Sequence, residues 1–413
     1  MSSDLPVLYA MRSSLYSSKA RSYLLKQGID YVETPPGDPS YIEQVVPEIS
    51  RWVIPVFRTA DGHLIQDTED VIDHLDAQVA PERSADPSEG VLSVLSRVFS
   101  MFGSEGLMRP ALHFRWNFDD DNMPFVLEDF GRGLVLPGGT NAFGSTNLDA
   151  EADAGTSETE ARAQIAEFAG NQMRKLTVDF GVNPDTIPEI ERCYAEFLAL
   201  FSAHLEEAPY LLGGRPTRGD FALMGPLYAH LSRDPYPSAI MKRDAWPVWS
   251  WTERMLVPIA GTGQYGKVST ELFDGDNLPS TLIDLLAYVG SEIADEAVAH
   301  VRFVDEYLAE NPDTAEGEVV GGKASKRSLG MVTWNWHGHE ITTHAIPYRI
   351  LHLQKIQGAF EALTPEGQAQ VREILSAAGL EVLLDLKARR RLKRSNNVEA
   401  WGEAQEPHLP ASI

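Results

Sequence analysis

The chain has very little cysteine: Cys193 is the only one among its 413 residues. One thiol cannot form a disulfide within the chain, which excludes a small secreted scaffold held together by disulfides. Cys193 lies in the apolar helical pattern EIERCYAEFLALF. Free cysteine is readily buried, so a core thiol is the simplest interpretation.

The chain also lacks long apolar runs and an excess of positive charge. No run reaches the roughly 18 apolar residues of a membrane helix, and no charged segment followed by an apolar one opens the sequence, as in a signal peptide. We therefore expect a cytoplasmic protein with no membrane partner. The 60 acidic and 35 basic residues give a formal charge of −25. Such a surface repels nucleic acid, which we exclude as a partner.

Strand and helix signals alternate over residues 5–80. Apolar strand patterns and helical patterns follow one another in the order β-α-β-α-β-β-α, with Gly28 ending the first helix and Asp61-Gly62 forming a hairpin turn. Strands are predicted at 6–11, 29–33, 52–57 and 63–66, and helices at 17–28, 38–46 and 67–79. A parallel first pair followed by an antiparallel hairpin predicts a small mixed sheet covered by helices.

Helical patterns dominate the rest of the chain. Residues 80–90 have the composition of a linker, and a Gly-, Ser- and acid-rich stretch at 136–160 predicts an exposed or mobile loop. After residue 260 we expect a long helix, a hairpin turning at His337-Gly338, and two further helices. The predicted domains are 1–80, 90–258 with an insertion near 131–165, and 260–413.

Three short motifs in the first 80 residues suggest a binding site. Ser13 and Ser14, in RSSLYSSKAR, lie where the first strand gives way to the first helix. They are a turn and cap, or one of them takes part in chemistry. Pro55 lies inside the strand signal WVIPV, where a cis bond would expose the backbone of Ile54 to a ligand and a trans bond would mark an edge strand.

The third motif is Asp67-Thr68, directly before the predicted third helix. Asp and Thr are both good N-cap residues, which is the simplest interpretation. The alternative is a binding site at the helix N-terminus, where unpaired N–H groups and the helix dipole attract an anionic group.

Together these motifs resemble the glutathione transferase family, and most closely its serine- and cysteine-type (zeta- and omega-like) members. Residues 12–33 are similar to that family's first helix and second strand, VIPV to its Val-Pro signature with a cis bond, and Asp67-Thr68 to its Glu-Ser pair. A second match, PYLLGGRPTRGDFALMGPLYAHL, is similar to the family's C-terminal signature. The resemblance covers about residues 5–258, and residues 260–413 match nothing in the family.

The resemblance implies a thioredoxin-like domain, a helical domain and, beyond the family, an additional mostly helical region with a hairpin. It implies a transferase or lyase in which the Ser14 hydroxyl stabilises the thiolate of the cosubstrate glutathione for attack on a small apolar electrophile. The resemblance further implies a role in detoxification and a homodimer. Tyr9, Ser13, Tyr16 and Ser17 are alternative hydroxyl donors, with Ser17 otherwise the expected helix cap.

The remaining glutathione contacts follow from the same resemblance. Arg51 would bind the glycyl carboxylate, Ile54 would offer its backbone before Pro55, and Asp67 and Thr68 would bind at the third helix. Leu15 stands where many relatives have proline. The alternative function is a non-catalytic binding or scaffold protein with the same fold. A thiol reductase is disfavoured because no cysteine lies near residue 14.

Three weaker signals lie outside these motifs. His337 and His339 share a strand face, but no acidic or cysteine partner is close in sequence, so we expect a solvated or packed hairpin and no metal site. Arg115 and Trp116 precede three aspartates, which predicts an exposed acidic loop or, by the resemblance, part of the second-substrate site. The basic segment 387–395 either binds a partner or docks on the chain's own acidic surface.

Overall fold

The computed structural model describes residues 5–88, 90–136, 158–258, 265 and 270–410. The strands are β1 (Val7–Tyr9), β2 (Val32–Thr34), β3 (Val56–Arg58), β4 (Leu64–Gln66), β5 (Met331–Trp336), β6 (His339–His344), β7 (Arg390–Ser395) and β8 (Val398–Ala404). The α-helices are α1 (Leu15–Gln27), α2 (Val46–Ile49), α3 (Thr68–Asp76), α4 (Val91–Met101), α5 (Met108–Trp116), α6 (Asp119–Leu134), α7 (Glu158–Leu176), α8 (Ile187–Glu207), α9 (Arg218–Pro226), α10 (Pro235–Asp244), α11 (Trp246–Arg254), α12 (Ser280–Glu310), α13 (Arg349–Glu361), α14 (Pro365–Ala377) and α15 (Val382–Asp385). Short π or 3-10 segments are η1 (Tyr41–Val45), η2 (Pro81–Arg83), η3 (Phe102–Gly106), η4 (Val178–Phe180), η5 (Leu227–Ser232) and η7 (Val320–Gly322).

The first four strands form the predicted mixed sheet, in the order β2-β1-β3-β4. β1 pairs with β2 in parallel and with β3 antiparallel, and β3 pairs antiparallel with β4. Alternate side chains face opposite sides of a strand. Leu8 and Phe57 therefore pack with α1 and α3, whereas Val7 and Val56 pack with η1 and α2.

Helix α1 begins at Leu15 and is capped by Ser14, whose side chain accepts a hydrogen bond from the Ser17 backbone N–H. The expectation that Ser17 is the cap was wrong. Ser17 lies inside the first turn and is fully buried, and its hydroxyl accepts a hydrogen bond from the Met11 N–H at 3.4 Å. The predicted stop at Gly28 is confirmed, with φ of 66°.

The middle region is helical, as expected, and its predicted capping box is present. Thr217 and Asp220 satisfy each other's backbone N–H groups at the start of α9. Helix α9 packs against α1 and α4, which joins this region to the sheet. The loop predicted at 136–160, within the insertion placed near 131–165, falls mostly on residues 137–157, which lie outside the described residues.

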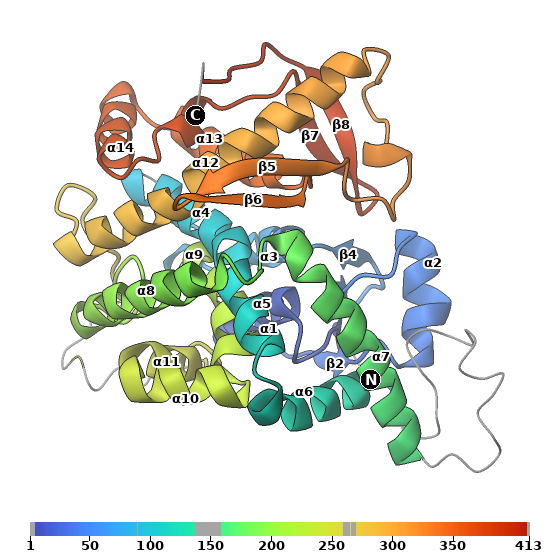
Figure 1. The fold of residues 1–413 in the computed structure, drawn as a ribbon. Helices are drawn as coiled ribbons and strands as arrows, with labels where there is room; N and C mark the ends of the chain where they lie inside the picture. The colour runs from blue at the N-terminus through green and yellow to red at the C-terminus, as the bar shows by residue number, and fades with distance from the viewer. Residues whose placement is uncertain (1–4, 89, 137–157, 259–264, 266–269, 411–413) are drawn as a thin grey trace.

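The last region continues the same hydrophobic core, because one cluster of buried side chains includes residues from all three predicted domains. Figure 1 shows α12 and the orange-to-red elements after it lying together over the rest of the chain, and α13 packs directly on α4. The hairpin of β5 and β6 turns at His337-Gly338, as predicted. The second hairpin, of β7 and β8, was not predicted.

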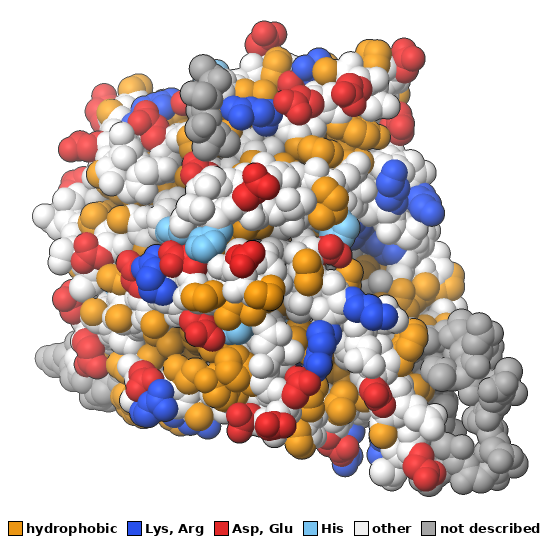
Figure 2. All heavy atoms as spheres, viewed as in Figure 1, with side chains coloured by type: hydrophobic (Ala, Val, Ile, Leu, Met, Phe, Trp, Pro, Cys, Tyr) orange, Lys and Arg blue, Asp and Glu red, His pale blue; other side chains and the backbone are white. Residues whose placement is uncertain are grey.

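The basic segment 387–395 docks on the chain's own acidic side chains. Arg389 pairs with Asp305 at 2.8 Å, and Lys393 pairs with Glu316 at 2.9 Å. This confirms the docking interpretation. Acidic and basic side chains are interspersed over the face in Figure 2, with hydrophobic side chains exposed between them. Among the described helices, none is both long and apolar enough to span a membrane.

Candidate functional site: an apolar cavity at the start of helix α1

A cavity of about 310 Å³ opens where the first turn of α1 meets helices α5, α6 and α7. Its lining comes from the start of α1, from the segment before β3, from those three helices and from η5. The lining residues are Met11, Ser13, Ser14, Leu15, Tyr16, Trp52, Ile54, Leu112, Arg115, Trp116, Phe130, Leu134, Phe168, Ala169, Gln172, Met173 and His230. A few polar groups converging on an apolar pocket are typical of a small-molecule site.

Large apolar side chains remain partly exposed at this cavity. Trp52 is 41% exposed, Phe168 47% and Met173 41%. Contact between these large apolar side chains and water is unfavourable. An apolar ligand that covered them would remove this unfavourable contact. The cavity is therefore suited to an apolar compound.

Ser14 lies in the cavity at the N-terminus of α1, with extended backbone (φ −87°, ψ 126°). Its oxygen accepts from the Ser17 N–H at 3.3 Å. A hydroxyl that accepts in this way still has its own hydrogen to donate. The unpaired N–H groups and dipole of the helix add positive potential at the same place. Together, these groups favour an anion beside Ser14.

The turn that carries Ser14 is held by a buried arginine. The Ser13 carbonyl accepts a hydrogen bond from Arg115 Nη1 at 2.8 Å, and His230 Nε2 lies 3.2 Å from the same oxygen. Arg115 in turn donates to both carboxylate oxygens of Asp234, at 2.6 and 2.7 Å. Burial, reinforced by the nearby Arg115 charge, holds the pKa of His230 well below its usual range, so this ring is neutral at neutral pH. The network fixes the position of the turn.

The acidic loop predicted after Arg115 and Trp116 does not exist. Both residues lie in α5 and are 1% and 3% exposed, and the aspartates that follow form the first turn of α6. Negative side chains are favoured at a helix N-terminus, which explains why three of them begin a helix here. Arg115 and Trp116 instead line the cavity at the start of α1.

Of the other predicted site residues, Ile54 reaches the cavity and Pro55 follows it. The Ile54–Pro55 bond is cis, as the family resemblance implied. Ile54 lines the cavity, whereas Pro55 is buried behind it. Among the alternative hydroxyl donors, Ser13 and Tyr16 line the cavity, while Tyr9 and Ser17 are 1% and 0% exposed in the core.

Asp67 and Thr68 lie elsewhere, and each already has a partner within the chain. Asp67 caps α3 by accepting from the Glu69 N–H at 2.8 Å, and its backbone φ of 100° is uncommon outside glycine. The same carboxylate oxygen accepts from the Tyr348 hydroxyl at 2.6 Å. Thr68 is buried and donates its hydroxyl hydrogen to the Tyr16 carbonyl at 3.3 Å.

Arg51 is bound by the second C-terminal hairpin. It is 6% exposed, and its Nη1 lies 2.8 Å from the Glu399 carboxylate of β8. Its Nη2 donates to the Asn397 carbonyl at 2.6 Å and to the Gln66 side chain. Asn397 also accepts from the Gln66 backbone N–H at 2.8 Å, so the tip of this hairpin lies on β4.

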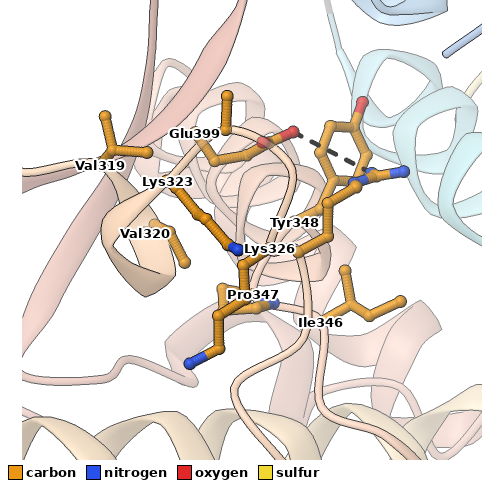
Figure 3. A pocket seen from close by; sticks show the side chains of 10 residues that line it. Val319, Val320, Lys323, Lys326, Ile346, Pro347, Tyr348 and Glu399 are labelled. Atoms are coloured by element: carbon orange, nitrogen blue, oxygen red, sulfur yellow. Dashed lines mark ion pairs between the residues drawn. The ribbon is translucent and has the colours of Figure 1, made fainter. Parts of the chain in front are cut away.

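Figure 3 shows the C-terminal side of this contact, with Glu399, Tyr348 and Pro347 around a cavity of only about 10 Å³. The dashed line from Glu399 marks a more distant arginine partner, Arg327, at 4.0 Å. The space is too small for a ligand. The C-terminal region therefore covers Asp67 and Arg51, while the cavity with Ser14 and Ile54 remains open.

A buried ionic cluster connects the same region to the sheet domain. Glu69 of α3 pairs with Lys19 of α1, with Arg218 of α9 at 3.0 Å and with Lys355 of α13 at 3.4 Å. Burial alone would raise the pKa of Glu69, but the surrounding cations hold it well below its usual range. The spacing of these residues along the chain gave no sign of the cluster, which exists only in the folded protein.

Comparison with known proteins identifies the N-terminal part of the chain. Residues 8–83 match the family model described as the glutathione S-transferase N-terminal domain. No curated protein matches the chain. The match to the family model agrees with the mixed sheet followed by a largely helical remainder, and it confirms the predicted thioredoxin-like fold of the first domain.

Solved structures resemble the chain only distantly. A glutathione S-transferase from Rhodospirillum rubrum F11 is 15% identical, with 68% of this chain and 99% of that chain covered and a TM-score of 0.30. Ure2p in complex with glutathione is 15% identical, with 62% and 90% covered and a TM-score of 0.31. Gtt2 from Saccharomyces cerevisiae is 14% identical, with 60% and 95% covered and a TM-score of 0.28. The family is shown by the matched residues instead: the chain has a glutathione S-transferase N-terminal domain at residues 8–83.

Proposed function

We propose that this chain is a glutathione-dependent transferase or lyase in which Ser14 stabilises the glutathione thiolate for attack on a small apolar electrophile. One observation supports the proposal above all others. Ser14 and Ile54, which come from different elements and were assigned to glutathione by resemblance alone, line the same apolar cavity. Its volume of about 310 Å³ suits one small compound.

The chemistry needs little more than the groups already described. A free thiol has a pKa of about 8.5, so only a minor fraction is thiolate at neutral pH. A hydrogen bond from Ser14 and the N-terminus of α1 both favour the anion. The sulfur would then form a bond to the electrophilic carbon, the displaced group would leave with the bonding electron pair, and the thiol proton would pass to solvent.

The rest of glutathione would need contacts that the chain now makes with itself. We propose that Ile54 offers its backbone beside Pro55, and that Arg51, Asp67 and Thr68 bind the charged ends of the tripeptide. Glu399 holds Arg51 and Tyr348 holds Asp67. Glutathione would therefore compete with the C-terminal region for these two side chains.

That competition is the specific observation that favours the second candidate, a non-catalytic binding protein with the same fold. In that case the cavity would still hold an apolar compound, but the covered Arg51 and Asp67 would not be available to glutathione. The two candidates differ in whether glutathione binds, and not in whether the cavity is used.

The test combines binding and activity in matched variants. Trp52 and Trp116 line the cavity, so tryptophan fluorescence can follow titration with glutathione and, separately, with an apolar electrophile. Thiol transfer is then compared between Ser14→Ala and Thr364→Ala. Both variants remove a hydroxyl that caps a helix, but Thr364 caps α14, outside the cavity lining.

We expect Ser14→Ala to lose thiol transfer while keeping ligand binding, and Thr364→Ala to keep both. Absence of glutathione binding at millimolar concentration would refute the transferase. If the apolar compound still binds in that case, the binding protein is the correct candidate.

The family resemblance also supports a homodimer that acts in the cytoplasm on reactive apolar compounds. Light scattering coupled to gel filtration tests the dimer directly, because it measures the mass of the particle in solution. A mass of one chain at micromolar concentration would contradict the dimer.

A further inference from the structure

Three potential metal ligands from distant parts of the sequence meet between α8 and the first C-terminal hairpin. Glu189 and Cys193 are four residues apart on α8 and so share one face of that helix. His337 lies at the turn between β5 and β6 and reaches the same point. One ligand atom from each of the three residues lies within 4.8 Å of the others.

The distances show how the three side chains are oriented. Glu189 Oε1 lies 3.8 Å from Cys193 Sγ and 3.9 Å from His337 Nδ1. The other ring nitrogen of the histidine, Nε2, lies 2.9 Å from the carboxylate of Glu292 on α12. A ligating histidine usually has this arrangement, with one nitrogen facing the metal and the other donating to a carboxylate.

The acidic partner is itself held in place. Glu292 is 4% exposed, accepts from the Trp336 indole N–H at 3.1 Å and lies 3.8 Å from Arg109. His337 and Gly338 have φ of 48° and 85°, the positive values that a two-residue hairpin turn of type I′ requires. Glu292 therefore holds the His337 ring from behind, and this contact is not one that the hairpin turn itself requires.

We propose that Glu189, Cys193 and His337 bind a divalent transition metal of the zinc class, with Glu292 orienting the histidine. A thiolate, an imidazole nitrogen and a carboxylate oxygen are a ligand set that zinc accepts. Ligand atoms around tetrahedral zinc lie roughly 3.5 Å apart, as its bond lengths require. Small side-chain rotations therefore complete the site and leave a fourth position for water.

Arg192 is the group that the metal must displace. Its Nη2 lies 3.3 Å from Cys193 Sγ and 2.7 Å from Glu189. The arginine side chain is 52% exposed and already pairs with Glu196 at 2.7 Å, so it can move toward that residue and solvent. On metal binding the cysteine thiol releases its proton to solvent and the thiolate becomes the ligand.

Such a metal would join the C-terminal region to the helical region. Two ligands belong to α8 and the third to the hairpin of β5 and β6, whose strand β5 packs on α12. The expectation of no metal site at His337 rested on the absence of a close partner in the sequence. The fold supplies those partners from residues far along the chain.

Cobalt substitution tests the proposal with unusual clarity, because Cys193 is the only cysteine. Any cobalt–thiolate charge-transfer band must come from that residue. We expect one equivalent of Co²⁺ to give this band in the near ultraviolet together with visible d–d bands, and Zn²⁺ to abolish both. Cys193→Ser should lose the thiolate band, and His337→Gln and Glu189→Gln should weaken binding at least tenfold.

Two matched controls separate the site from general effects. Glu206→Gln changes an exposed carboxylate on the same helix, α8, and His344→Gln changes another histidine of the same hairpin, which lies 3.6 Å from Asp179. Both should bind cobalt as the unchanged protein does. Circular dichroism confirms that each variant is folded. Absence of the thiolate band with the unchanged protein, or equal cobalt binding in His337→Gln, would overturn the proposal.

Discussion

The hydroxyl of Tyr348 allows the predicted competition with glutathione to be measured. In Tyr348→Phe the ring remains and only the hydrogen bond to Asp67, 2.6 Å long, is lost. A hydrogen bond to a charged group contributes roughly 1.5–3 kcal/mol to stability. Asp67 is only partly buried and keeps its bond from the Glu69 N–H, so we expect a loss near the lower end of that range.

The same change should strengthen glutathione binding. If the amino group of glutathione binds Asp67, Tyr348→Phe removes the hydroxyl that competes for this carboxylate. Glutathione binding should then become more favourable by a large part of the free energy of that hydrogen bond. A gain of about 1.4 kcal/mol corresponds to a tenfold lower dissociation constant. Isothermal titration calorimetry with glutathione measures this directly, and urea denaturation measures the stability.

Tyr288→Phe is the matched control. The Tyr288 hydroxyl is also buried and donates to the Cys193 carbonyl at 3.0 Å, but it lies away from Asp67. This variant should lose stability without any change in glutathione affinity. An unchanged or weaker affinity in Tyr348→Phe would refute the idea that Tyr348 and glutathione share Asp67.

Two further predictions concern stability. Burial lowers the pKa of His352 from 6.5 to about 4. Between these two pH values the unfolded chain binds a proton that the folded chain does not, so the free energy of unfolding decreases as the pH falls through this range. The unchanged protein should be more stable than His352→Gln by about 2 kcal/mol less at pH 5 than at pH 7, as measured by urea titrations. The same difference in unfolding free energy at both pH values would contradict the lowered pKa of His352. Arg115→Met should cost about 3–5 kcal/mol in the same assay, because it leaves the Asp234 carboxylate buried and unpaired. Adding Asp234→Asn should recover part of that loss, and additive losses would show that the two side chains do not act as a pair.

Local patterns in the sequence were enough to predict the sheet and the ends of several helices. Leu8 and Val7, on neighbouring positions of one strand, face different helical layers, as strand alternation requires. Gly28 and Thr364 end and begin helices as expected, because glycine adopts positive φ and a threonine hydroxyl accepts from the first turn. Such signals depend only on neighbours along the chain.

The remaining features depend on contacts between distant residues, which no local pattern encodes. The hairpin tip at Asn397 pairs with Gln66, and Arg115 holds the Ser13 carbonyl across the domain boundary. The basic composition of residues 387–395 indicated only that this segment prefers acidic partners. The covering of Arg51 by Glu399 could therefore not be predicted, although both residues were visible in the sequence.

The pKa of the glutathione thiol bound to the protein tests the central claim most directly. Thiolate absorbs in the ultraviolet, so a pH titration of the complex, with the glutathione-free protein subtracted to remove Cys193, gives this value. The account predicts a pKa well below the roughly 8.5 of a free thiol in the unchanged protein and in Thr364→Ala. It predicts a return toward the free value in Ser14→Ala. The same thiol pKa in the presence and absence of the Ser14 hydroxyl would contradict it.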